Sequence, residues 1–263
     1  MSRISEKFSA LRKEGRIAFM PFLVAGDPDF KTGLEIVKET VRRADLLEIG
    51  FPYSDPLADG PTIQAADSRA LAAGMTTDRV FESIAAIQKF CSIPISVLVY
   101  ANLVYQYGIE RFYRAAKTAG VDGVLIPDVP IEESSPFVAS ALKAGIDPIF
   151  LMTQMTTPLR LKKILRLARG YLYVVSVLGV TGVRNRIDAE TPRIIKRLKS
   201  STDLPLAVGF GISQKEHIRA LQKSGADGAI VGSSLIRIIE KNTHNKKKLL
   251  RQLGIYLDDL AAV

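Results

Sequence analysis

The sequence predicts an α/β protein, a closed (β/α)8 barrel, and three observations lead to that prediction. Short apolar runs alternate along the chain with segments of helical periodicity, which is typical of βα units in a parallel sheet. There are eight such runs, the number of strands that this barrel requires. The chain has 263 residues, without a linker or a change of composition to divide it, and such barrels commonly occupy about 250 residues. We therefore expect a single domain, 1–263.

The predicted strands are short and apolar on both faces, as strands covered by helices must be. The runs are 17–25, 46–49, 93–99, 123–127, 148–152, 171–178, 204–208 and 228–231.

The predicted helices lie between these runs and carry apolar residues at three- and four-residue spacing. In 29–43, for example, Phe30, Leu34, Val37 and Val41 share one face, and similar patterns occupy 107–119, 159–169 and 214–224. Glycines such as Gly120 and Gly145 follow several of these segments and indicate helix ends. Two regions exceed the simple repeat: a helix at 5–14 before the first strand, and a doubled helical stretch at 62–90 after the second.

An open doubly wound sheet is the alternative architecture, and glycine patterns argue against it. Such sheets often carry a Gly-x-Gly-x-x-Gly turn after the first strand, where this chain reads AGDPD. Gly209 and Gly211 form only a Gly-x-Gly after a late strand, which is a weak dinucleotide signal.

Composition excludes several classes of protein. The hydrophobic fraction is 47%, which is incompatible with wholesale disorder. The single Cys91 excludes an intramolecular disulfide, suits a reducing compartment and is expected to be a buried structural thiol. No apolar run reaches the roughly 18 residues of a membrane span, and 1–15 lacks the apolar stretch of a signal peptide, so we expect a cytoplasmic protein.

The net charge of +9 raises the possibility of an anionic partner. The basic run 241–251 contains no interleaved aromatic residues, so it is predicted to be a solvated helix face, and nucleic-acid binding is not expected. His217 and His244 are predicted to lie on exposed helices, and no His, Cys or carboxylate spacing indicates a metal site.

The segment 46–64 is the densest candidate for chemistry, because function in these barrels lies at the carboxyl ends of the strands. Glu48 interrupts an apolar run, and alternation directs it either into the barrel or toward the helices. A charge at the barrel mouth can act as an acid or base, whereas a charge facing the helices gains nothing evident. Asp59 follows eleven residues later in a loop rich in Pro and Gly, and Asp55 shares that loop; spacing alone does not rank these two aspartates.

Small residues follow the last three predicted strands and indicate a phosphate site. They are Gly179, Thr181 and Gly182, then Gly209 and Gly211, then Gly232, Ser233 and Ser234. Loops in these positions often present backbone N–H groups to a phosphate. The loop 179–192 is long and polar enough to act as a lid. Phe22, Tyr100, Leu125 and Tyr173, near strand ends, could form an apolar slot for an aromatic ring.

The segment LEIGFPYSDPLADGPTIQ closely resembles the signature of the tryptophan synthase alpha subunit family. Further similarity lies in FMPFLVAGDP (19–28), YANLVYQYGI (100–109), PDVPIEES (127–134), GVTG (179–182), GFGIS (209–213) and GSSLIRIIE (232–240). The resemblance covers nearly the whole chain and implies a TIM barrel. It also implies a lyase that cleaves indole-3-glycerol phosphate to indole and glyceraldehyde 3-phosphate.

The resemblance assigns roles that spacing could not. It implies that Glu48 is the catalytic acid/base, that Asp59 is its partner carboxylate and that Asp55 lies at a subunit interface. Phosphate would be bound by Gly182, Gly211, Gly232 and Ser233, and Thr181 would meet Asp59 when the lid closes. The indole would lie among Phe22, Tyr100, Leu125, Leu151, Tyr173 and Phe210. The implied partner is a beta subunit in an alpha2beta2 tetramer; pyridoxal phosphate belongs to that subunit, and no cofactor or metal is expected in this chain.

Two alternatives stay open, and departures from the commoner family pattern bear on the second of them. Val177 and Leu178 precede the predicted lid, and 152–155 is unusually rich in Met; either could weaken lid closure or coupling to the beta subunit. One alternative is a barrel that acts on another phosphorylated metabolite. The other is a catalytically weak barrel that mainly activates a beta subunit. Since the predicted phosphate cradle consists of backbone amides and a serine, the excess positive charge is expected on the outer helices, such as 193–199.

Overall fold

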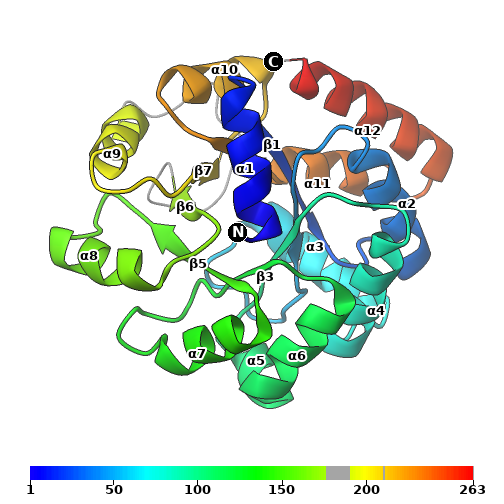
Figure 1. Cartoon of the computed structure of the whole chain (residues 1–263). Helices are drawn as coiled ribbons and strands as arrows, with labels where there is room; N and C mark the ends of the chain where they lie inside the picture. The colour runs from blue at the N-terminus through cyan, green and yellow to red at the C-terminus, as the bar shows by residue number, and fades with distance from the viewer. Residues whose placement is uncertain (176–189, 210, 263) are drawn as a thin grey trace.

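A computed structural model describes residues 1–175, 190–209 and 211–262 and contains a closed barrel of eight parallel strands (Figure 1). Each strand pairs with the next in the chain, and β8 pairs with β1 to close the barrel. The strands are β1 (Ala18–Val24), β2 (Leu47–Gly50), β3 (Ile95–Leu98), β4 (Gly123–Leu125), β5 (Asp147–Met152), β6 (Leu172–Val175), β7 (Leu206–Gly209) and β8 (Gly228–Val231). Every strand coincides with one of the predicted apolar runs, and the predicted barrel is confirmed.

Helices surround the barrel (Figure 1). They are α1 (Arg3–Lys13), α2 (Phe30–Thr40), α3 (Pro61–Ala72), α4 (Thr77–Gln88), α5 (Ala101–Tyr107), α6 (Ile109–Ala119), α7 (Ser135–Ala144), α8 (Pro158–Leu167), α9 (Glu190–Lys199), α10 (Lys215–Lys223), α11 (Ser233–Glu240) and α12 (Lys246–Ala261). The predicted doubled stretch corresponds to α3 and α4. The segment 107–119 was predicted as one helix, but it is divided. Its first residue, Tyr107, ends α5, and α6 begins at Ile109, because Gly108 between them has a φ of +87°.

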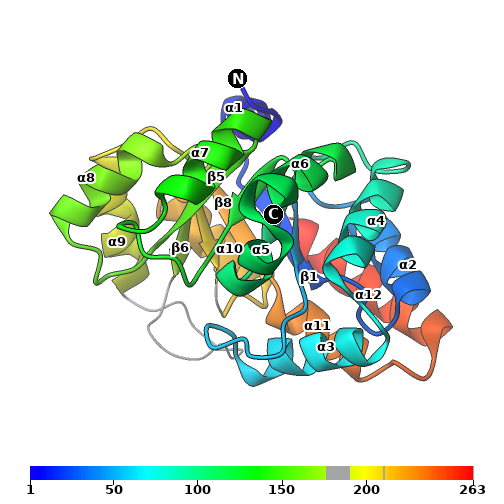
Figure 2. The same ribbon diagram turned by 90° about the horizontal axis from the view of Figure 1, so that it is seen from below.

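The N-terminal helix α1 covers the amino-terminal end of the barrel. Its Phe8 ring lies 5.9 Å from the ring of Tyr171, which directly precedes β6. Arg3 forms an ion pair with Asp122, just before β4, at 2.9 Å. Figure 2 shows α1 at one end of the molecule and α3 and α11 at the other. The opposite end, where the strands finish, is therefore the one left for a ligand.

Four details differ from the sequence predictions. His217 is buried, with 5% of its surface exposed, because it lies on the α10 face that also carries Leu221. His244 is exposed as predicted, but it lies in a turn before α12. Because this turn precedes α12, the basic run 241–251 is part of that helix only from Lys246 onward. The last residues of the predicted lid 179–192, from 190 on, form the first turn of α9.

The predicted burial of the single cysteine, Cys91, is confirmed. No group of His, Cys, Asp or Glu side chains in the described part of the chain has an arrangement that could hold a metal ion. Among the described helices, none has both the length and the apolar character needed to cross a membrane.

Candidate active site

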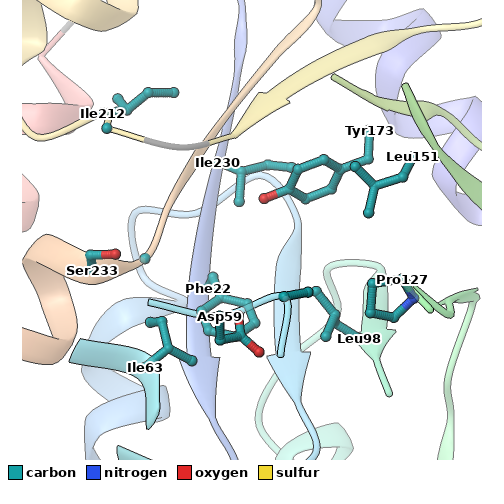
Figure 3. Close-up of a pocket in the computed structure, with 13 residues that line it drawn as sticks. Phe22, Asp59, Ile63, Leu98, Pro127, Leu151, Tyr173, Ile212, Ile230 and Ser233 are labelled. Carbon is teal, nitrogen blue, oxygen red and sulfur yellow. The ribbon is translucent and has the colours of Figure 1, made fainter. Parts of the chain in front are cut away.

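A pocket opens at the carboxyl ends of the strands and contains about 710 Å³ of empty space, including the part open to solvent (Figure 3). The pocket is lined by Phe22, Ala58, Asp59, Ile63, Leu98, Pro127, Leu151, Tyr173, Gly211, Ile212, Ile230, Gly232 and Ser233. All eight strands, or the segments that follow them, contribute to this list, so the pocket depends on closure of the barrel.

Glu48 points into the barrel, which decides between the two orientations that the sequence left open. Its Oε1 accepts a hydrogen bond from the Tyr171 hydroxyl at 3.1 Å, and that hydroxyl lies 3.0 Å from Ser96 Oγ. The Glu48 side chain is fully buried, and its Oε2 has no hydrogen-bond partner among the described residues. Burial raises the pKa of Glu48 to about 8; the Tyr171 hydrogen bond opposes this rise, and the charge of Asp59 adds to it. At neutral pH the group is therefore mainly a protonated acid.

Asp59 is held at the pocket by an aromatic clamp. The Tyr100 hydroxyl donates to Asp59 Oδ2 at 2.7 Å and accepts the backbone N–H of Ala58 at 3.0 Å. The Tyr53 ring stacks on the Tyr100 ring, with the centroids 4.9 Å apart. Burial raises the pKa of Asp59, and the Tyr100 hydrogen bond opposes the rise by stabilising the carboxylate. The clamp thus fixes both the position of this carboxylate and that of its loop.

The two carboxyl groups share one electrostatic environment. Burial raises the pKa of Tyr173 well above its usual value, and the charges of both Glu48 and Asp59 raise it further. Because Tyr173 lines the pocket, both carboxyl groups act on the same space. A third acid, Asp67 on α3, lies nearby; burial raises its pKa to about 8, with further contributions from Asp59 and Asp27.

One end of the pocket presents backbone N–H groups. Gly211 has a φ of +76°, a conformation that glycine adopts without strain. Gly232 directly precedes α11, whose N-terminus has no side-chain cap, so its first N–H groups remain available to an anion. A Cβ at Gly232 would lie 3.0 Å from the Phe22 ring, so glycine also permits close packing here. Figure 3 shows Ser233 and Ile212 at this end of the pocket.

The other end of the pocket is apolar. Figure 3 places Leu98, Pro127, Leu151 and Tyr173 away from Ser233, with Asp59 between the two ends. The pocket thus combines an apolar slot, a carboxylate and the uncapped N-terminus of a helix in one cavity. We call the last of these the anion-binding end, because helix N-termini favour anions. This combination suits a ligand with a flat ring and an anionic tail.

Comparisons with known proteins show the family to which the chain belongs. The sequence model of the family described as "Tryptophan synthase alpha chain" matches residues 8–263. The chain belongs to the tryptophan synthase alpha chain family. It is 49% identical over 258 residues to the tryptophan synthase alpha chain of Methanoregula boonei, covering 98% of this chain and 96% of the relative. It is also 49% identical over 243 residues to that of Methanothermobacter thermautotrophicus, covering 92% and 90%.

Solved structures of the same family have the same fold. The structure of tryptophan synthase subunit alpha from Legionella pneumophila matches with a TM-score of 0.89 and 33% identity, covering 99% of this chain and 97% of that one. A chain from the tryptophan synthase a2b2 complex of Pyrococcus furiosus matches with a TM-score of 0.88 and 35% identity, covering 94% and 98%.

The residues that the family resemblance assigned to the ligand fall into three groups. Phe22, Leu151, Tyr173, Gly211, Gly232 and Ser233 line the pocket. Glu48, Tyr100 and Leu125 are buried and do not line it; Tyr100 instead holds Asp59, and Leu125 belongs to β4. Thr181, Gly182 and Phe210 lie outside the described residues, as do Val177 and Leu178.

Sequence reasoning missed several lining residues. Leu98, Pro127 and Ile230 lie two residues from Tyr100, Leu125 and Gly232, respectively. Since side chains two residues apart on a strand share a face, the alternation along each predicted strand could have identified them. Ala58, Ile63 and Ile212 lie outside the strands, where parity gives no information.

Proposed function

We propose that this member of the tryptophan synthase alpha chain family cleaves indole-3-glycerol phosphate to indole and glyceraldehyde 3-phosphate. The observation that carries the proposal is the fully buried Glu48, whose pKa is raised to about 8, next to a pocket with an apolar end and an anion-binding end. An acid that remains protonated at neutral pH can donate a proton and then accept one back.

The proposed reaction needs one proton donated and one removed. Glu48 protonates ring carbon C3 of the indole, which places positive charge on the ring nitrogen. The resulting carboxylate then takes the proton from the glycerol hydroxyl next to the ring. That hydroxyl becomes the aldehyde as the carbon–carbon bond breaks, and the bonding electron pair restores the neutral aromatic indole. Glu48 ends the cycle protonated, so no oxidant or reductant is consumed.

Asp59 has the complementary role in this proposal. It accepts a hydrogen bond from the indole N–H and stabilises the charge that develops on that nitrogen. This role requires the ionised form of Asp59, which the Tyr100 hydroxyl favours by donating to Oδ2. A buried protonated glutamic acid and a hydrogen-bonded aspartate thus perform different tasks because their surroundings differ.

Binding of the substrate divides between the two ends of the pocket. The indole would lie among Phe22, Leu98, Leu151 and Tyr173, and the phosphate would bind the N–H groups at Gly211, Gly232 and Ser233. Gly182 would complete the phosphate site, Phe210 would contact the indole, and Thr181 would meet Asp59; these three assignments rest on the family resemblance alone.

The proposed partner is a tryptophan synthase beta subunit, by analogy with the a2b2 complex of Pyrococcus furiosus. The loop that carries Asp59 also carries the exposed Asp55 and Leu57, and Leu57 is 93% exposed. We infer that this loop contacts the beta subunit, so that the partner acts on the position of Asp59. In this proposal pyridoxal phosphate belongs to the beta subunit, and the alpha reaction proceeds by proton transfer without a cofactor in this chain.

The test is indole release from indole-3-glycerol phosphate by the purified chain, with and without a beta subunit. We expect release in both cases and a higher rate with the partner. Stimulation of the beta subunit without any indole release would contradict the proposed catalysis and favour an activator. Cleavage of another phosphorylated metabolite in preference to this one would contradict the proposed substrate.

A further inference from the structure

Behind the anion-binding end of the pocket lies a polar cluster that the proposed chemistry does not use. It consists of Ser213, His217, Ser234 and Tyr256, which come from the loop after β7, from α10, from α11 and from α12. Ser213, His217 and Ser234 are each at most 9% exposed. Polar side chains in such a position are costly unless they make hydrogen bonds, so their presence calls for an explanation.

Two side chains of the cluster bind the same backbone segment. His217 Nδ1 accepts the N–H of Ser213 at 3.3 Å, and the Tyr256 hydroxyl donates to the carbonyl of Ser213 at 2.7 Å. Both backbone polar groups of Ser213 are thus fixed by side chains from two different helices. The acceptor role of Nδ1 requires a neutral imidazole with its proton on Nε2.

Ser213 directly follows Gly211 and Ile212, which line the pocket. Its position therefore sets where the Gly211 backbone meets a ligand. Ser234 relates in the same way to Gly232 and Ser233, because it follows them at the start of α11.

The helix that carries Tyr256 also packs near this second segment. Helix α12 lies against α11, which begins at Ser233 and includes Ser234. Ser213 Oγ, His217 Nε2 and Ser234 Oγ make no hydrogen bond among the described residues.

We propose that Tyr256 on α12 and His217 on α10 are positioning residues for the phosphate-binding loops. Through these two side chains, the helices fix the loops on the side that faces away from the ligand. The inference rests on the proposed function, since it takes the anion to be the phosphate of the substrate. Neither residue touches the substrate; each acts through the peptide groups of Ser213.

The test uses the reverse reaction, because it separates the two halves of the substrate. Condensation of indole with glyceraldehyde 3-phosphate gives one KM for the apolar half and one for the phosphorylated half. In Tyr256→Phe, the KM for glyceraldehyde 3-phosphate should rise about tenfold, as expected for loss of one buried hydrogen bond. The KM for indole and kcat should change by less than about twofold, since the apolar end and Glu48 are untouched.

Tyr107→Phe is the matched control. The Tyr107 hydroxyl donates to Asp78 Oδ1 at 2.7 Å, so this variant also loses one tyrosine hydrogen bond, here between α5 and α4 and away from the pocket. It should leave both KM values at those of the unmodified chain. If Tyr256→Phe changes both KM values equally, or neither, the positioning role is refuted.

His217 provides a second pair of variants, which keeps the proposal testable if Tyr256→Phe folds poorly. His217→Leu removes the acceptor for the Ser213 N–H, and the KM for glyceraldehyde 3-phosphate should rise. His217→Asn places an amide oxygen near the former Nδ1 position and should restore most of the affinity. Equal effects of Leu and Asn would overturn the assignment of His217.

Calorimetric binding of glycerol 3-phosphate to the full chain provides a readout that does not depend on turnover. Affinity should fall about tenfold in Tyr256→Phe and remain unchanged in Tyr107→Phe. A chain that binds glycerol 3-phosphate in this pattern but produces no indole would refute the proposed catalysis while supporting the positioning role. If the chain produces indole normally but Tyr256→Phe shows no loss of affinity, the positioning role is refuted and the proposed catalysis is supported.

Discussion

Replacement of Glu48 by glutamine should abolish cleavage and at the same time stabilise the fold. The amide has nearly the shape of the acid, and it can still accept a hydrogen bond from Tyr171. It can neither donate nor accept the catalytic protons, so indole release should fall by several orders of magnitude. Binding of glycerol 3-phosphate should be retained, because the anion-binding end is unchanged.

The gain in stability follows from the raised pKa of Glu48. The carboxyl group titrates near 4.5 when exposed and at about 8 in the folded chain. The unfolded state therefore loses its proton over a pH range in which the native state keeps it, and stability falls as pH rises from about 4.5 to 8. At pH 7, which is about 2.5 units above the pKa of the exposed group, the free energy of unfolding is lower by about 3 kcal/mol than at low pH. Above pH 8 the whole shift in pKa applies, and the loss is about 5 kcal/mol. Glutamine has no such titration.

The assay is urea unfolding of both proteins at several pH values between 4 and 9. The difference in free energy of unfolding, variant minus unmodified chain, should grow with pH by up to these amounts and level off above pH 8. Glu132→Gln is the control: Glu132 is exposed, its hydrogen bond to Arg160 lowers its pKa, and its pH dependence should have the opposite sign. A difference for Glu48→Gln that does not vary with pH would refute the reasoning.

Three further substitutions test the surroundings of the site. Asp67→Asn should also raise stability increasingly between about pH 4 and 8, because burial raises the pKa of Asp67 to about 8; urea unfolding at two pH values measures it, and no change with pH would contradict it. Asp59→Asn should lower kcat for indole release by about 100-fold with little loss of glycerol 3-phosphate affinity, and a normal kcat would remove Asp59 from the mechanism. Arg69→Leu should cost about 3 kcal/mol in unfolding free energy, because it leaves the buried Asp27 without its ion pair at 2.7 Å; a cost near zero would show that Asp27 needs no partner.

The barrel could be predicted from the sequence because its strands are buried on both faces. Each strand therefore appears as a nearly continuous apolar run, without the alternation of polar and apolar residues that a strand exposed on one face shows. The sequence also singled out Glu48, since a charge inside an apolar strand is costly without a use. The orientation of Glu48 could not be predicted. Alternation along a strand shows which residues share a face, but it does not show which of the two faces points into the barrel. The aspartate loop had no periodicity at all, and ranking Asp59 above Asp55 required the family resemblance.

The residues around the phosphate end were less predictable for a different reason. His217 follows Lys215 and Glu216, so local polarity predicted exposure, although its four-residue spacing to Leu221 placed it on the buried face. Contacts such as that of Tyr256 with Ser213 join segments 43 residues apart in the chain. No local pattern encodes such a pairing, which arises only when the closed barrel brings α12 against the loop after β7.

The two acids are held by different parts of the fold. Glu48 lies within β2, paired in register with Phe22 on one side and Ser96 on the other, so its backbone cannot move without opening the barrel. Asp59 lies on a loop, where the Tyr100 hydroxyl holds both its carboxylate and the N–H of Ala58. The strand keeps Glu48 buried, which raises its pKa and costs stability at neutral pH. A residue retained at that cost on the most rigid part of the fold is better explained by catalysis than by packing.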